Sequence, residues 1–228
     1  MKSKYIAWAI APIFLIGCSD YLETPPSVDY GENEVFATRA DAEKLLTTLY
    51  AEGMPYGFCM SSSNTDRRLL SSSTLASACD EGEDVATWAM GNAAWNAGNH
   101  TNTNFPWDED CRFYLRNHTM RVANLILKRI HEVPFDEGDP DFNKRTTGEA
   151  YFMRAMLLWE VVYRYGGMPI VRDVIDPTDF SQRPRNSFSD CIDSILIDCD
   201  RATQYLPDYY TDNTKLGRAT RIAALALK

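Results

Sequence analysis

The sequence of 228 residues predicts an all-α fold. Apolar residues recur with helical periodicity in several separate segments, and most of these segments begin after residues that commonly cap helices. The predicted helices follow one another in pairs and are interrupted by long irregular loops. This arrangement resembles a helical solenoid, in which each unit buries its apolar face against its neighbours.

The N-terminus has the order of a secretory signal. Lys2 and Lys4 precede an apolar stretch at 5–16, which is followed by Gly17 and Cys18. A cysteine directly after the small residue is the bacterial lipobox pattern, in which the thiol is lipidated. The apolar stretch is shorter than the about 20 residues that a membrane-spanning helix needs. We therefore expect residues 1–17 to be a lipoprotein signal peptide, with lipidation at Cys18 attaching the protein to a membrane.

The residues after Cys18 are expected to form a tether and then one helical domain. The stretch 18–33 is polar and turn-rich, which is typical of a linker. The domain is expected at 34–228, and its first helix is predicted to follow the N-cap residue Thr38, with Asp41 three residues on. The apolar side of this helix comprises Ala42, Leu45, Leu46 and Leu49.

Two further helices should carry most of the core. The first, Asp110–Ile130, has Phe113, Leu115, Val122, Leu125, Ile126 and Ile130 on its apolar side. The second is expected to open at Thr147-Gly148, to run over Glu149–Tyr165 and to end at Gly166-Gly167. Because this second helix is apolar nearly all round, it must be covered on several sides and should be the centre of the core.

The last part of the chain predicts a short extended run and two more helices. After the run 168–174, Ser187 should cap a helix that ends before Pro207. Its apolar stripe comprises Phe188, Ile192, Ile195, Cys199 and Ala202. The final helix, Arg218–Lys228, is expected to point Ile222, Leu225 and Ala226 inward. Since its pattern stops without a C-cap, we expect the sequence to be the front portion of a longer protein, truncated at the C-terminus.

The segment from about 53 to 107 is different in character. Serine, glycine and asparagine dominate it, aromatic residues are scattered through it, and neither a helical nor a strand period persists. So long an irregular stretch is uncommon in a compact domain unless it is functional. This is where the sequence predicts a binding site.

Composition and charge exclude some partners. The chain carries a formal net charge of -9, and 45% of its residues are hydrophobic, enough for a real core. An acidic surface repels phosphate backbones, so nucleic acid is not an expected partner. Attachment to a membrane would have to come from the lipid.

The cysteines match no disulfide framework or zinc site. Of the six, Cys191 and Cys199 lie on one predicted helix, separated by about 12 Å of helical rise, too far to bridge. Cys59 and Cys79 form the one pair that remains open as a disulfide. The favoured interpretation is that the cysteines are small buried hydrophobes.

Four motifs, in this order, resemble the SusD/RagB family of Bacteroidetes outer-membrane lipoproteins. They are Cys18-Ser19-Asp20-Tyr21-Leu22-Glu23; Trp107…Tyr114…Val122-Ala123-Asn124-Leu125-Ile126; Gly148-Glu149-Ala150-Tyr151-Phe152-Met153-Arg154-Ala155, continuing to Tyr163-Arg164-Tyr165-Gly166-Gly167-Met168-Pro169-Ile170-Val171; and Ala202…Leu206-Pro207 with Gly217-Arg218-Ala219-Thr220-Arg221-Ile222-Ala223-Ala224. The third is highly specific. The resemblance spans essentially the whole mature chain but only the N-terminal part of a typical member.

The resemblance implies a scaffold of tetratricopeptide-like helix pairs on the outer-membrane surface. Members of the family sit over a SusC-like TonB-dependent transporter and load it with oligosaccharides or, in some lineages, peptides. They bind ligands and do not catalyse, and no cofactor is implied. The expected partners are therefore the SusC-like transporter, an oligosaccharide and the membrane through the lipid.

The irregular segment contains the residue types that a sugar site needs. A sugar ring stacks its C–H face on flat aromatics, while amides, carboxylates or arginine bond its hydroxyl rim. The candidate ligand-binding residues are Arg68, Asp80, Trp88, Asn92, Trp95 and Asn96. By order and approximate spacing, Arg68, Trp88 and Asn92 are the nearest counterparts of an Arg, a Trp and an Asn in starch-binding relatives. The pattern departs from those relatives because Trp88 lies further from Asp80-Glu81 and the second tryptophan is displaced to Trp95. The alternative is that both tryptophans pack under a loop.

Other constellations favour structural interpretations. The acidic residues Asp80, Glu81, Glu83 and Asp84 lack a calcium-loop pattern and are better interpreted as a solvated loop. Asp190, Asp193, Asp198 and Asp200 are interpreted as the solvated face of their helix. Carboxylate pairs for glycoside hydrolysis could come from either cluster, but nothing places one in an apolar pocket. No metal-ligand spacing joins the histidines, so no metal and no enzymatic activity are expected.

Two alternatives to glycan capture remain open from the sequence. The chain could be a helical-repeat adaptor that binds only protein, or an incomplete fragment of a SusD-like protein.

Overall fold

The computed structural model describes residues 31–54, 80, 98, 107–175 and 183–228. These residues form α1 (Glu32–Val35), α2 (Arg39–Gly53), α5 (Trp107–Arg129), α6 (Phe142–Tyr165), α7 (Phe188–Tyr205) and α8 (Arg221–Leu227), with the short 3₁₀ helices η4 (Ile130–Glu132) and η5 (Asn213–Lys215). No strand occurs among them, which agrees with the predicted all-α fold. The expected signal peptide and Cys18 lie outside the described residues, as do most of the tether and the Cys59–Cys79 pair.

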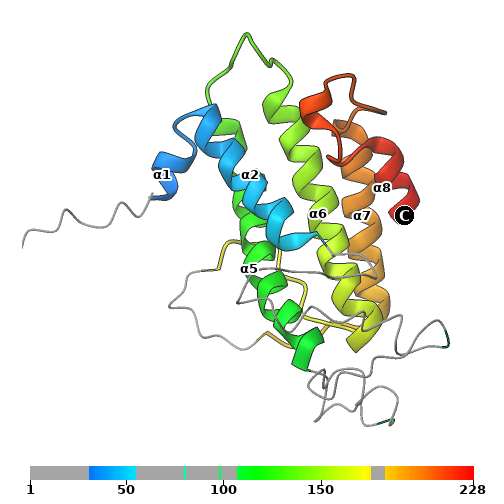
Figure 1. The fold of residues 1–228 in the computed structure, drawn as a ribbon. Helices are drawn as coiled ribbons and strands as arrows, with labels where there is room; N and C mark the ends of the chain where they lie inside the picture. Colours follow the sequence, from blue (N-terminus) through cyan, green and yellow to red (C-terminus); the bar gives the residue numbers. More distant parts are fainter. Residues whose placement is uncertain (1–30, 55–79, 81–97, 99–106, 176–182) are drawn as a thin grey trace, which may run out of the picture.

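Helix α6 lies at the centre of the bundle, as the sequence predicts. Figure 1 shows it between α5 and α7, with α2 in front of α5 and α6 and with α8 beside α7. Met153 and Leu157 on α6 are fully buried, and Val162 is 1% exposed. A helix that is apolar on several sides is stable in water only when its neighbours cover those sides.

The start of α6 corrects the sequence interpretation. The helix begins at Phe142, so Thr147 and Gly148 lie inside it rather than opening it. Its N-cap residue, Asp141, makes no side-chain capping bond, and the sequence therefore holds no clear start signal. Gly148 is a packing glycine: a Cβ built on it would lie 2.8 Å from Cγ of Leu206 beyond the end of α7.

Two predicted N-caps are confirmed. The Thr38 hydroxyl accepts a hydrogen bond from the backbone N–H of Asp41 at 3.2 Å. Ser187 forms a capping box, because its hydroxyl accepts from the N–H of Asp190 at 3.0 Å while the Asp190 carboxylate accepts from the N–H of Ser187 at 3.2 Å. Each cap satisfies backbone donors that have no partner inside the helix.

The register of α8 is opposite to the predicted one. Ile222 is 61% and Leu225 50% exposed, and Ala226 is also exposed, whereas Ala224 is fully buried. The sequence of α8 is apolar nearly all round, so its periodicity does not identify the inner face. Ala224 belongs to the main apolar core, and α8 packs beside α7, so the buried side of α8 is the one that carries this small residue.

The other helix faces largely follow the predicted pattern. Val122, Leu125 and Ile126 of α5 are buried as expected, and so is Ile130, which begins η4 directly after α5. On α7, Ile195, Cys199 and Ala202 are buried, but Phe188 at its start is 52% exposed. Cys191 and Cys199 are free and buried, consistent with their interpretation as small hydrophobes. No helix in the described part of the chain is both long and apolar enough to cross a bilayer.

Candidate functional site

The segment after α6 crosses the bundle in an extended path and helps to form a cavity. Gly166 ends α6 with φ of +75°, a conformation that favours glycine. Gly167 lies so close to the later chain that a Cβ on it would be 2.1 Å from the carbonyl oxygen of Asn186. The side-chain oxygen of Asn186 accepts a hydrogen bond from the N–H of Ile170 at 3.0 Å, and this bond holds the two chain segments together.

A side chain of α5 fixes the same segment from the other side. The Asn124 amide donates to the carbonyl oxygens of Val171 at 3.0 Å and Asp173 at 3.2 Å. Its own oxygen accepts a hydrogen bond from Arg154 of α6 at 2.9 Å. Asn124 is 2% exposed, and these bonds satisfy both ends of its buried amide.

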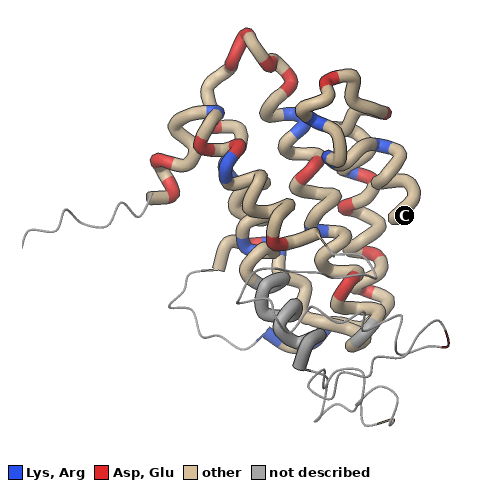
Figure 2. Tube along the Cα trace, in the orientation of Figure 1, with Lys and Arg blue, Asp and Glu red and all other residues tan. Residues whose placement is uncertain are grey.

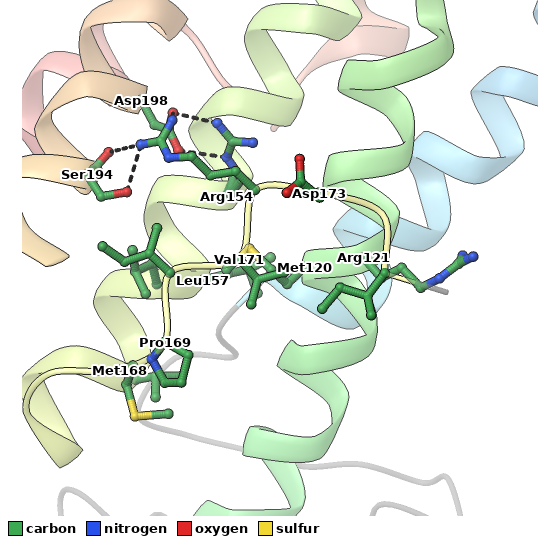
Figure 3. Close-up of a pocket in the computed structure, with 15 residues that line it drawn as sticks. Met120, Arg121, Arg154, Leu157, Met168, Pro169, Val171, Asp173, Ser194 and Asp198 are labelled. Atoms are coloured by element: carbon green, nitrogen blue, oxygen red, sulfur yellow. Dashed lines mark hydrogen bonds and ion pairs between the residues drawn. The ribbon is translucent and has the colours of Figure 1, made fainter. Parts of the chain in front are cut away.

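Beneath this segment lies a cavity of about 340 Å³ between α5, α6 and α7. Figure 3 shows Met120 of α5, Leu157 of α6 and the segment residues Met168, Pro169 and Val171 around it. Leu158, Val161, Ile170 and Ile175 complete its apolar wall, and Arg121 and Asp173 also line it. The wall is thus aliphatic and thioether in character.

One end of the cavity is polar and holds a buried ion pair. The Arg154 guanidinium donates to both carboxylate oxygens of Asp198, each at 2.7 Å (Figure 3). Arg172 approaches the same carboxylate at 3.3 Å and donates to the hydroxyl of Ser194 at 2.7 Å. Bidentate arginine–carboxylate pairs are among the stronger protein hydrogen bonds and keep both partners in a defined geometry.

Asp198 corrects the sequence interpretation of α7. Asp190, Asp193 and Asp200 are exposed, as expected for a solvated face, but Asp198 is 2% exposed. The signal was present in the spacing, because Asp198 lies three residues after Ile195 and four before Ala202, on the buried face. An aspartate at such a position requires a buried cation, and Arg154 on the apolar helix α6 is that cation.

The cavity is suited to apolar groups rather than to a sugar ring. Among the described residues that line it there is no aromatic side chain on which a sugar face could stack. Its buried carboxylate is already occupied by Arg154 and Arg172. We therefore interpret this end of the cavity as a structural junction that positions the crossing segment.

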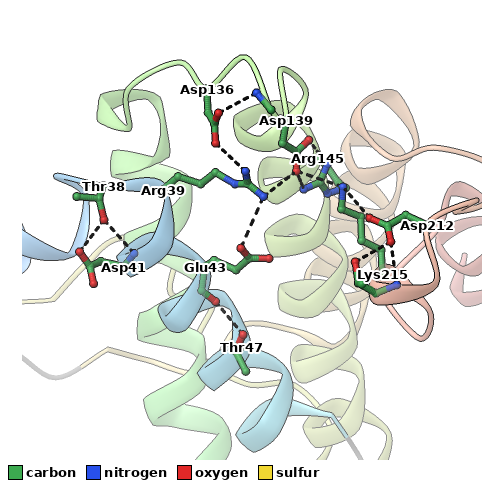
Figure 4. Close-up of polar contacts among 12 residues, drawn as sticks. Thr38, Arg39, Asp41, Glu43, Thr47, Asp136, Asp139, Arg145, Asp212 and Lys215 are labelled. Atoms are coloured by element: carbon green, nitrogen blue, oxygen red, sulfur yellow. Dashed lines mark hydrogen bonds and ion pairs between the residues drawn. The ribbon is translucent and has the colours of Figure 1, made fainter.

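A second polar cluster joins the N-terminal ends of α2 and α6. Figure 2 shows acidic and basic residues close together at this end of the bundle, and Figure 4 shows their contacts. Asp139 contacts Arg145 at 2.7 Å, Lys215 at 3.2 Å and Arg39 at 3.4 Å. The hydrogen bonds from Arg145 lower the pKa of Asp139 to about 2.

Glu149 extends this cluster into the core. It is fully buried and accepts hydrogen bonds from Tyr210 and Arg218, each at 3.3 Å. Burial raises the pKa of Glu149, and the neighbouring cations Arg218 and Arg145 partly oppose that effect. The charged groups of this cluster join α2, α6, η5 and the loop before α8 to one another.

The predicted ligand-binding residues fall almost entirely outside the described part of the chain. Asp80 is described and lies exposed in a turn, whereas Arg68, Trp88, Asn92, Trp95 and Asn96 lie outside it. The glycan site thus stays a prediction. In the described residues, no group of three or more histidine, cysteine, aspartate or glutamate side chains could hold a metal ion.

The helices described above form an all-helical fold of the tetratricopeptide-like class. The chain belongs to the SusD-like family, whose profile, described as "Starch-binding associating with outer membrane", matches residues 20–228. The predicted family resemblance is therefore confirmed.

Two curated relatives are SusD-like proteins of Formosa agariphila. SusD-like protein P2 is 24% identical over 230 residues, covering 99% of this chain and 42% of the relative. SusD-like protein P38 is 27% identical over 123 residues, covering 54% of this chain and 21% of the relative. The chain thus spans less than half the length of either one.

Solved structures show the same fold. A SusD-like protein from Bacteroides fragilis matches with a TM-score of 0.63 and 27% identity, covering 86% of this chain and 35% of that one. A laminarin-binding SusD-like protein matches with a TM-score of 0.66 and 22% identity, covering 84% of this chain and 39% of that one.

Proposed function

We propose that this chain is part of a cell-surface lipoprotein that binds oligosaccharides and passes them to a SusC-like TonB-dependent transporter. The observation that carries the proposal is the match of a starch-binding, outer-membrane family to residues 20–228. The laminarin-binding relative, which shares the fold, supports a glycan as the ligand. The proposed role is binding without catalysis.

The proposed glycan site lies in the irregular segment and uses Arg68, Asp80, Trp88, Asn92, Trp95 and Asn96. Its tryptophans would supply the stacking surface that the aliphatic cavity between α5, α6 and α7 lacks. We propose that attachment to the outer membrane comes from acyl chains on Cys18, which follows the signal-like sequence at 1–17.

Binding to a panel of neutral oligosaccharides, measured by affinity electrophoresis and calorimetry, tests the proposal. We expect at least one glycan to bind and Trp88→Ala to weaken it about tenfold or more, because a stacking platform is removed. The matched control is Trp159→Ala, a 37%-exposed tryptophan on α6 outside the segment, which should leave the affinity unchanged.

Two results would contradict the proposal in different ways. Failure of every glycan to bind, together with co-purification of a TonB-dependent transporter, would favour the protein-binding adaptor. Binding that Trp88→Ala and Trp95→Ala both leave intact would place the glycan elsewhere on the chain. Loss of radiolabelled palmitate incorporation in Cys18→Ser would test the lipid attachment separately.

A further inference from the structure

A second hollow, of about 400 Å³, adjoins the aliphatic cavity where the crossing segment meets α5, α6 and α7. Its lining contains four cationic side chains: Lys128, Arg154, Arg172 and Arg201. We infer that this basic groove binds an oxyanion, either a carboxylate or a sulfate. If the proposed function holds, the oxyanion belongs to an acidic saccharide.

The charge of the groove is opposite to that of the chain. The whole chain carries a formal net charge of -9, yet the one acidic residue in the groove lining is Asp173. Asp198 partly neutralises Arg154 and Arg172, but Lys128 and Arg201 together outweigh Asp173 and leave a local positive potential in a concave place. An oxyanion is the ligand class that this potential attracts.

The four cations divide into two pairs with different roles. Arg154 and Arg172 are committed to Asp198, at 2.7 Å and 3.3 Å, and hold the crossing segment in place. Lys128 and Arg201 are exposed and take part in no salt bridge within the described part of the chain. The N–H donors of these two side chains can therefore bind a ligand without breaking an ion pair within the described residues.

Tyr151 positions two arginine side chains in the groove. The guanidinium carbons of Arg201 and Arg154 each lie 5.4 Å from the centroid of its ring. Stacking on an aromatic ring restricts the rotamers of a long arginine side chain, so less conformational entropy is lost when it binds. The planar fork of Arg201 also matches the two oxygens of a carboxylate or sulfate group.

The groove favours a single oxyanion on a small ligand over a phosphate backbone. A nucleic acid presents many phosphates and would meet the acidic remainder of the surface. A uronate or sulfate ester places one charge in the groove and leaves hydroxyls that Tyr151 and Asp173 can contact at its edge.

Calorimetry at constant ionic strength with three saccharides tests the inference. Tetragalacturonate supplies carboxylates, a κ-carrageenan tetrasaccharide supplies sulfate esters, and galactotetraose is the uncharged reference. We expect at least one acidic saccharide to bind about tenfold more tightly than galactotetraose, the size of one charged hydrogen bond. The double variant Lys128→Gln/Arg201→Gln should lose this preference.

The matched control is Lys44→Gln, which removes an exposed cation on α2 with 72% side-chain exposure, away from the groove. It should keep the wild-type preference. Thermal melts followed by circular dichroism should give midpoints that differ little among the variants, because each variant loses only an exposed contact, the stacking of Arg201 on Tyr151 or the ion pair of Lys44 with Asp41. A midpoint lowered as far as that of Arg154→Met, which breaks a buried ion pair, would assign Lys128 and Arg201 a structural role and overturn the inference.

The outcomes separate this inference from the proposed function. Equal affinity for acidic and neutral saccharides, or a preference that the double variant keeps, overturns the oxyanion groove while leaving glycan binding intact. If no saccharide binds, inorganic sulfate is the remaining probe. Sulfate stabilises folded proteins in general, so a rise in melting midpoint that is larger in the wild type than in the double variant would retain the oxyanion site and reject the proposed function. An equal rise in both would overturn the groove.

Discussion

Arg154 is the residue on which the junction between α6 and α7 depends. It is 5% exposed and its bidentate partner, Asp198, is 2% exposed. In Arg154→Met the Asp198 carboxylate would stay buried with Arg172 as its remaining cation, at 3.3 Å. Removing one partner of a buried pair typically costs about 3–5 kcal/mol of unfolding free energy. Urea unfolding of wild type and variant measures this loss.

Two further variants show whether the loss comes from an unpaired buried charge. The double variant Arg154→Met/Asp198→Leu should recover part of this loss, because it removes the unpaired buried carboxylate but leaves the Asn124 oxygen and Arg172 without these partners. Arg221→Met breaks the exposed pair with Asp208 and should cost less than about 1 kcal/mol. If Arg154→Met cost no more than Arg221→Met, the buried pair would not be the stabilising contact.

At the scale of elements, the contact between α6 and the end of α7 depends on Gly148. A Cβ at this position would lie 2.8 Å from Cγ of Leu206 and 2.9 Å from Cβ of Tyr205. Gly148→Ala should therefore force the two helices apart and destabilise the chain by about 1–3 kcal/mol, despite the better helix propensity of alanine. Chemical denaturation gives the value.

Gly53, the last residue of α2, is the matched control. A Cβ there would lie 3.0 Å from Cε of Met153, the far end of a flexible side chain that can move aside. Gly53→Ala should consequently be close to neutral. Equal losses in the two variants would mean that the close approach of Leu206 and Tyr205 does not determine the effect at Gly148.

The elements also show what sequence patterns can and cannot specify. Capping chemistry is local, so Thr38 and Ser187 were sufficient to predict where α2 and α7 begin. The inner face of α8 was not predictable, because Ile222 and Leu225 are as apolar as the residues that face inward. The buried face of α8 is determined by how Ala224 packs in the core. Packing between distant segments produces no periodic pattern in the sequence.

The same limit applies to the sites. Arg154 and Asp198 are 44 residues apart in the chain, and spacing alone places each on a helix face without identifying its partner. The basic groove is lined by residues from three helices and the crossing segment. No single sequence motif could therefore have predicted it. The predicted glycan residues, by contrast, come from one stretch of sequence and are recognisable from residue type and family resemblance.

At the scale of the whole molecule, Asp139 links distant segments in a way that depends on pH. It joins Arg39 of α2, Arg145 of α6 and Lys215 of η5 (Figure 4). Its pKa is lowered from 3.8 to about 2 in the fold, so the unfolded chain takes up a proton first as the pH falls. The stabilisation is therefore complete above about pH 4 to 5 and is lost as the pH falls toward 2.

Asp139→Asn tests this linkage. The variant should be less stable than wild type at pH 6, because Arg145, 7% exposed, loses its carboxylate partner. The two unfolding free energies should approach each other as the pH falls to about 2, where about half of the wild-type carboxyls are protonated. Asp193→Asn, an exposed position on α7, should follow the wild-type curve throughout. Thermal unfolding from pH 6 to pH 2 measures the stability of all three proteins. A constant difference between wild type and Asp139→Asn across that range would show that the charge of Asp139 does not contribute to the stability of the fold.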